Sequence, residues 1–212
     1  MRPRRGFSCF QQVLYFCSSQ DYPKAYNFAG LGTIAGHELV HGFDDEGVQY
    51  DKSGELLCKD WNQCGWMDRR SKKGFRDMAH TQCCPVKEGY VHCANGATTQ
   101  GENIADIGGV QATYQAYLEY MKKRDEPEKR LPGLEQYTPN QLFWMFYANH
   151  WCSNDGAFDI STQLMVDPHS PSSCRVNQVL QDIPGFGQDF GCKMSQKLFP
   201  TPDYRCKVWV MS

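Results

Sequence analysis

The stretch that decides the fold is Gly36-His-Glu-Leu-Val-His41. On a helix, His37 and His41 lie one turn apart on the same face, so both imidazoles can reach one divalent ion about 2.0 to 2.1 Å from nitrogen. Glu38 then lies on an adjacent face, from which its carboxylate can address a metal-bound water without taking a coordination position. Chance places this pattern in about 0.7% of chains of this composition, so the interpretation needs a second element.

That second element is Gly101-Glu-Asn-Ile-Ala-Asp106. Two histidines leave a catalytic zinc site one protein ligand short of the usual three. Glu102 and Asp106 are four residues apart on an apolar helix, where a buried pair of carboxylates is costly unless a cation or donors neutralise it. The sequence therefore predicts Glu102 as the third ligand and Asp106 as the hydrogen-bond partner of a ligating imidazole. The alternative places both carboxylates on the solvent face.

Composition limits the class of protein. The chain has 212 residues, of which 41% are hydrophobic, and a net charge of -2. This length allows one domain or a piece of something larger. The chain lacks the excess of basic residues that would indicate a nucleic-acid partner. No apolar run approaches the roughly 20 residues needed to span a bilayer. Eleven cysteines, an odd number, indicate an oxidising compartment and disulfides. Cys83, Cys84 and His92-Cys93 fit no standard zinc cluster, which favours disulfides or free thiols there.

Apolar periodicity predicts a mostly helical chain. We expect helices over Phe28–Phe43, Gly101–Lys123 and Ser173–Gln181, and a short one around Trp61–Met78. A further helix should begin after Thr138, because Thr138-Pro-Asn-Gln141 is a capping-box sequence with proline at the first helical position. The aromatic residues that follow are expected in the core. They are Phe143, Trp144, Phe146, Tyr147 and Trp151.

The ordered motifs resemble one protein family. Ala35-Gly-His-Glu-Leu-Val-His-Gly-Phe-Asp-Asp-Glu-Gly47 and Gly101-Glu-Asn-Ile-Ala-Asp-Ile-Gly-Gly109 resemble the neprilysin and endothelin-converting-enzyme family of zinc metalloendopeptidases. Shorter matches follow in the same order, over residues 27–209 in all. They are Leu131-Pro-Gly-Leu134, Gln141-Leu-Phe143, Trp151-Cys152, Asp167-Pro-His-Ser-Pro171 with Arg175, and Cys206-Lys-Val-Trp209.

The resemblance implies a fold and a set of site residues. The fold would be the truncated C-terminal catalytic portion of a thermolysin-like zincin, mainly α with little β structure, over residues 27–212, with residues 1–26 unplaced. The resemblance implies one Zn²⁺ per chain and peptide hydrolysis on oligopeptides. The implied roles are His37, His41 and Glu102 as zinc ligands, Glu38 as general base, Asp106 as the carboxylate that orients the first histidine, His169 as oxyanion stabiliser with Asp167 as its partner, and Arg175 as a substrate-binding residue.

The same resemblance bears on localisation and on alternatives. It implies the extracellular face of the plasma membrane or secretion, a Cys83–Cys206 disulfide, and an ectodomain whose upstream part is missing here. Without that part, the alternative is a catalytically impaired zinc-binding fragment that binds peptides or partners without turnover. A third possibility is a secreted disulfide-rich interaction module without a metal.

Overall fold

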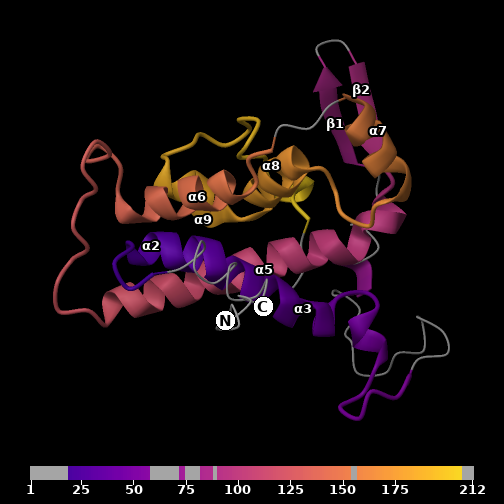
Figure 1. The fold of residues 1–212 in the computed structure, drawn as a ribbon, viewed down its shortest axis with the longest axis horizontal. Helices are drawn as coiled ribbons and strands as arrows, with labels where there is room; N and C mark the ends of the chain where they lie inside the picture. The colour runs from indigo at the N-terminus through magenta and orange to yellow at the C-terminus, as the bar shows by residue number, and fades with distance from the viewer. Residues whose placement is uncertain (1–18, 58–71, 75–81, 88–89, 154–156, 207–212) are drawn as a thin grey trace, which may run out of the picture.

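The computed structural model describes residues 19–57, 72–74, 82–87, 90–153 and 157–206. Helices dominate this part of the chain, and the one named sheet is a two-stranded antiparallel hairpin (Figure 1). The helices are α2 (Lys24–Asn27), α3 (Thr33–Val40), α5 (Gly96–Lys122), α6 (Pro139–His150), α7 (Ala157–Val166), α8 (Ser172–Asp182) and α9 (Pro184–Asp189), and the strands are β1 (Gln82–Lys87) and β2 (Tyr90–Ala94). The predicted mainly α fold with little β structure is confirmed.

The motif-bearing helix is one continuous helical run. A π-helical turn over Phe28–Gly32 joins α2 to α3, and a 3₁₀ turn over His41–Phe43 follows α3. The run therefore begins at Lys24, four residues before the predicted start, and ends at the predicted Phe43. A π-helical turn widens a helix locally and is frequent near functional sites.

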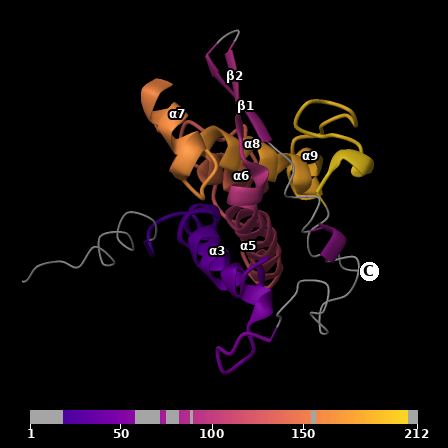
Figure 2. The same cartoon turned by 90° about the vertical axis from the view of Figure 1, so that its right-hand side faces the viewer.

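Helix α5 runs in the opposite direction to α3 and crosses it, packing against α3 and the helical turns on either side of it (Figure 1), and the two helices lie side by side in the turned view (Figure 2). The two backbones nearly touch where Gly36 meets Gly109: a Cβ on Gly109 would lie 2.5 Å from the backbone nitrogen of His37. Glycine lowers helix propensity, and here the close approach explains why it is present. The crossing brings the turn that carries Asp106 against the turn that carries His37.

Aromatic side chains of α5 and α6 form the core. Tyr117, Phe143, Trp144 and Tyr147 are each at most 1% exposed, and the Tyr117 and Phe143 rings stack with centroids 5.5 Å apart. Helix α6 begins as predicted: the Thr138 hydroxyl accepts from the backbone nitrogen of Gln141, whose side chain accepts from Thr138 in return. Phe146 and Trp151 pack at the edge of this core, only partly buried.

Several predicted bounds were wrong. Helix α5 begins at Gly96 rather than Gly101, because the Asn95 side chain caps it by accepting from the nitrogen of Ala97. Helix α9 begins at Pro184, where we had predicted only the end of the preceding helix. Proline is compatible with the first position of a helix as well as with the end of one. Helix α7 was not predicted.

Some predictions lie outside the described residues. Most of Trp61–Met78 is among them, and so is the side chain of Cys83. The suggested Cys83–Cys206 disulfide is not borne out, because Cys206 carries no disulfide in the structure. Cys174 on α8 is disulfide-bonded. Within the part of the chain that the structure describes, no helix combines the length and the apolar character needed to cross a membrane.

Candidate metal centre

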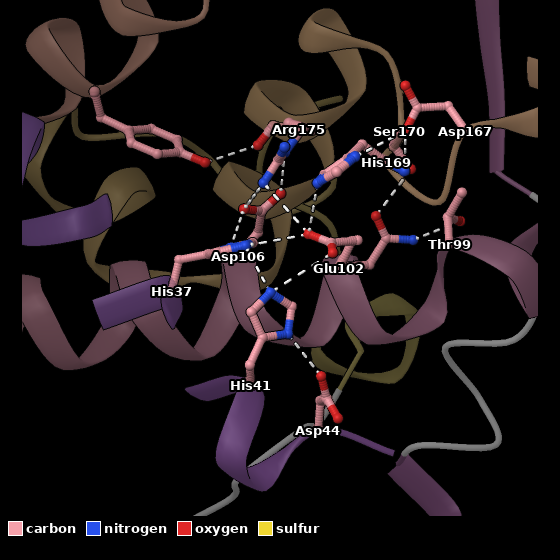
Figure 3. Close-up of polar contacts among 12 residues, drawn as sticks. His37, His41, Asp44, Thr99, Glu102, Asp106, Asp167, His169, Ser170 and Arg175 are labelled. Atoms are coloured by element: carbon pink, nitrogen blue, oxygen red, sulfur yellow. Dashed lines mark hydrogen bonds and ion pairs between the residues drawn. The ribbon is translucent and has the colours of Figure 1, made fainter. Parts of the chain in front are cut away.

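Three side chains from the two paired helices converge on one point. His37 and His41 come from the α3 run and Glu102 from α5, and one ligand atom from each lies within 4.8 Å of the others (Figure 3). The Nε2 atoms of His37 and His41 are 3.0 Å apart. Glu102 oxygens lie 3.1 Å from His37 Nε2 and 3.6 Å from His41 Nε2.

These separations suit a tetrahedral ion. With bonds of about 2.0 to 2.2 Å, two ligand atoms of a tetrahedral zinc lie about 3.4 Å apart. Glu102 Oε2 is also buried and accepts no hydrogen bond of good geometry from the described residues. A buried carboxylate oxygen without such a bond is costly unless a cation lies beside it. The donor set and its spacing therefore fit a zinc ion.

Two neighbouring charged side chains, Asp106 and Arg175, orient the first histidine, His37. Asp106 Oδ1 lies 2.8 Å from His37 Nδ1, which keeps the hydrogen on Nδ1 and turns Nε2 toward the metal position. Arg175 donates to both oxygens of Asp106, from Nε and Nη2, at 2.7 Å each. Burial alone would lower the pKa of His37, but the carboxylates of Asp106 and Glu102 outweigh it and raise that pKa to about 9. Metal binding at Nε2 must therefore displace a proton.

The second histidine has a partner that the sequence analysis did not single out. Asp44 Oδ2 lies 2.7 Å from His41 Nδ1, and Asp44 Oδ1 accepts from the backbone nitrogens of Glu46 and Gly47 at 2.9 and 2.7 Å. The carboxylate is 5% exposed. The sequence contained a signal for this contact, because a carboxylate three residues beyond a ligating histidine can reach the second ring nitrogen of that histidine.

His169 reaches the centre from the loop between α7 and α8. Its Nε2 lies 3.2 Å from Glu102 Oε2. The Asp167 carboxylate accepts from the backbone nitrogen of His169 at 2.8 Å and lies 2.7 Å from Nδ1. Burial raises the pKa of Asp167, but its contacts with His169 prevail and the net shift is downward. Burial likewise raises the pKa of Glu102, and the neighbouring imidazoles lower it overall.

Arg175 is held on several sides. Its guanidinium lies over the ring of Trp151, 4.1 Å from the centroid, and Tyr147 donates from its hydroxyl to the Arg175 carbonyl oxygen at 2.8 Å. Burial lowers the pKa of Arg175, but Asp106 and Glu102 raise it overall. Trp151 and Tyr147 were predicted only as core residues, and their contacts with Arg175 were missed.

A cavity of about 180 Å³ opens beside the centre. The exposed Glu38 faces it from α3, one residue along from His37. Its wall contains both apolar side chains and charged groups of the centre. The lining residues are Thr33, Ile34, His37, Glu38, Asp106, Val110, Tyr147, Trp151, His169 and Arg175. The cavity therefore places two carboxylates, two imidazoles and one guanidinium around a common space.

Comparisons with known proteins agree with this arrangement. Residues 11–206 match peptidase family M13. Neprilysin-1 of Caenorhabditis elegans is 41% identical over 196 residues, which are 89% of this chain and 24% of the relative. The solved Haemonchus galactose containing glycoprotein complex is 52% identical, with a TM-score of 0.80 over 94% of this chain and 32% of that one. The Mycobacterium tuberculosis zinc metalloprotease Zmp1, in complex with an inhibitor, is 28% identical, with a TM-score of 0.74 over 92% and 29%.

The chain spans about a quarter of the length of the curated relative. The family match covers nearly all of the chain, and one of the similar structures is that of a zinc metalloprotease, which confirms the predicted fold class and the predicted resemblance. The chain belongs to peptidase family M13, the family of the neprilysins and endothelin-converting enzymes.

Proposed function

We propose that this chain is the zinc-binding catalytic part of a metalloendopeptidase that hydrolyses oligopeptides. The observation that carries the proposal is the convergence of His37, His41 and Glu102, with ligand atoms separated by 3.0 to 3.6 Å. These three residues would hold one zinc ion. When bound, zinc polarises a carbonyl and lowers the pKa of a coordinated water toward about 7.

The roles of the other residues follow from their positions. Glu38 faces the cavity and would take the proton of the attacking water, then return it to the leaving amine. His169 would donate from Nε2 to the oxygen that becomes negative, since its Nδ1 is held by Asp167. The Arg175 contacts with Asp106 use Nε and Nη2, so the guanidinium can hold Asp106 and still offer Nη1 to a peptide carbonyl.

The cavity also suggests which peptides bind. Ile34, Val110 and Trp151 supply an apolar part of its wall next to Arg175. An apolar side chain adjacent to the cleaved bond would fill this space, while its backbone carbonyl meets the guanidinium. The extracellular or secreted location remains a proposal from family membership, and the disulfide of Cys174 is consistent with an oxidising compartment.

The test is cleavage of a fluorescence-quenched peptide with an apolar residue after the scissile bond. We expect turnover that stops with a chelator and returns with one equivalent of zinc. Glu38→Gln should bind zinc normally and lose at least about 100-fold in kcat. Glu55→Gln, the same change at an exposed position, should behave as wild type. A folded, zinc-loaded protein that cleaves nothing would refute the proposal.

A second candidate is a zinc-binding fragment that captures peptides without turnover. Its support is that Leu39, on the motif-bearing helix, is 70% exposed and Phe43 is 49% exposed, in a chain a quarter as long as its relative. Equal peptide binding by the wild type and Glu38→Gln, with no product from either, would favour this second function.

A further inference from the structure

We infer that Asn103 is a positioning residue that holds the loop carrying His169 in register with the metal-binding turn of α5. The inference rests on the proposed function, because it concerns how that site keeps its hydrogen-bond donor in place. Asn103 directly follows Glu102 in the chain. The helix turn that supplies the third metal ligand thus also supplies the attachment point of the loop.

A directed chain of hydrogen bonds joins the loop to the helix. Ser170 donates from its hydroxyl to Asn103 Oδ1 at 2.9 Å, and Asn103 donates from Nδ2 to the Thr99 hydroxyl at 3.0 Å. Thr99 donates in turn to the backbone carbonyl of Asn95 at 3.2 Å. Ser170, Asn103 and Thr99 are 1%, 5% and 3% exposed. Water cannot replace these bonds, so losing one leaves a buried polar atom unsatisfied.

This series of hydrogen bonds needs an amide side chain at its centre. The hydrogen of the Thr99 hydroxyl is already given to Asn95, so this hydroxyl can only accept from residue 103. Because Asn103 turns Nδ2 toward Thr99, its Oδ1 faces Ser170, and the Ser170 hydroxyl donates to it. Asparagine is the side chain of this size that accepts on one side and donates on the other. The bonding pattern thus explains an uncharged polar residue between two carboxylates, Glu102 and Asp106.

The link acts on His169 through its neighbour. The two contacts between Asp167 and His169 lie within the loop, so they shape it but do not attach it to α5. The bond from Ser170 to Asn103 crosses between the loop and the helix, one residue from His169. Rate depends steeply on donor placement: an error of 1 Å can cost about 100-fold. The link therefore keeps His169 Nε2 near the centre, while Asp167 selects its tautomer.

The first test compares Ser170→Ala with Ser173→Ala in the full zinc-loaded chain. Ser173 is exposed and lies on the first turn of α8, so its variant should match wild type. Ser170→Ala should lower kcat on the quenched peptide about 10-fold, change KM less than about 2-fold, and leave zinc affinity unchanged. An unchanged kcat, or an equal loss in zinc affinity, would overturn the inference.

A double variant separates positioning from general stability. If Ser170 acts through His169, then Ser170→Ala should cost nothing further in a His169→Ala background. If the hydrogen bond merely stabilises the fold, the same factor of about 10 should recur in both backgrounds, which would overturn the inference. The comparison uses ratios of rates from folded protein at one temperature.

Two further measurements keep the inference testable if Ser170→Ala folds poorly or if the wild type shows no turnover. Thr99→Val removes the acceptor of Asn103 without touching the loop, and Thr99→Ser restores the hydroxyl. Hydrogen–deuterium exchange of residues 167–171 should be faster in Thr99→Val and normal in Thr99→Ser. Unchanged exchange in Thr99→Val would overturn the link between Asn103 and the loop, whereas a wild type without turnover counts only against the proposed function.

Discussion

The crossing of α3 and α5 can be tested by replacing Gly109 with alanine. The added Cβ would lie 2.5 Å from the His37 backbone nitrogen and 2.8 Å from two further backbone atoms of Gly36 and His37. Ordinary contact begins at 3.4 Å, so the helices must separate by about 0.9 Å, and no side-chain rotation can relieve the overlap. Overpacking of this kind costs about 1 to 3 kcal/mol, and the gain in helix propensity returns at most about 1 kcal/mol.

The separation should weaken the metal centre more than the fold. For a domain of this size, a net loss of about 1 to 2 kcal/mol lowers Tm by roughly 3 to 6 °C. Zinc ligands must lie within about 0.2 Å of their proper distances, so zinc affinity should fall at least about 10-fold. Calorimetry and competition with a chromogenic chelator measure the two effects. Gly42→Ala is the matched control, because nothing lies within 4 Å of its Cβ position. Wild-type Tm and zinc affinity in Gly109→Ala would refute the reasoning.

Three other predictions concern stability. Asp106→Asn leaves the charge of Arg175 without its carboxylate partner. The free energy of unfolding, measured by urea denaturation, should therefore fall by about 3 kcal/mol. Adding Arg175→Met should recover part of that loss. Burial raises the pKa of Asp182 from 3.8 to about 7 despite a hydrogen bond and a nearby arginine that lower it. The folded chain then binds this proton more tightly than the unfolded chain, so stability falls as pH rises from about 4 to about 7 and levels off above that pH. The stability advantage of Asp182→Asn over wild type should therefore grow by about 2 to 3 kcal/mol between about pH 5 and pH 8. Equal pH profiles would contradict this assignment. Thr138→Ala should cost about 1 kcal/mol by thermal denaturation because it removes the α6 cap, and a change below about 0.3 kcal/mol would count against the capping box.

Local patterns predicted much of the fold. The capping box at Thr138 placed the start of α6, because both of its hydrogen bonds are made between residues three apart. Histidine spacing predicted the shared face of His37 and His41, since a helix fixes that geometry. The start of α5 was missed because residues 96–100 are polar or small and show no apolar period. Helix α9 was missed because Pro184 is compatible with both a stop and a start.

The sequence and the family resemblance predicted some contacts among the candidate site residues and missed others. His37 and Asp106 are 69 residues apart in the chain, and their contact was predicted from the cost of a buried carboxylate pair and from the family resemblance, because periodicity says nothing about which side chains meet over such separations. The close glycine contact between α3 and α5 lets these two residues lie side by side. The placement of Arg175 between Asp106 and the Trp151 ring depends on three helix positions at once and has no local sequence signature.

The most direct test of the central claim is a crystal structure of the zinc-loaded chain with diffraction data collected on both sides of the zinc absorption edge. We expect one strong anomalous peak per chain, within about 2.0 to 2.2 Å of His37 Nε2, His41 Nε2 and a Glu102 carboxylate oxygen. A peak bound elsewhere, or a Glu102 carboxylate beyond bonding distance of the ion held by the two histidines, would contradict it.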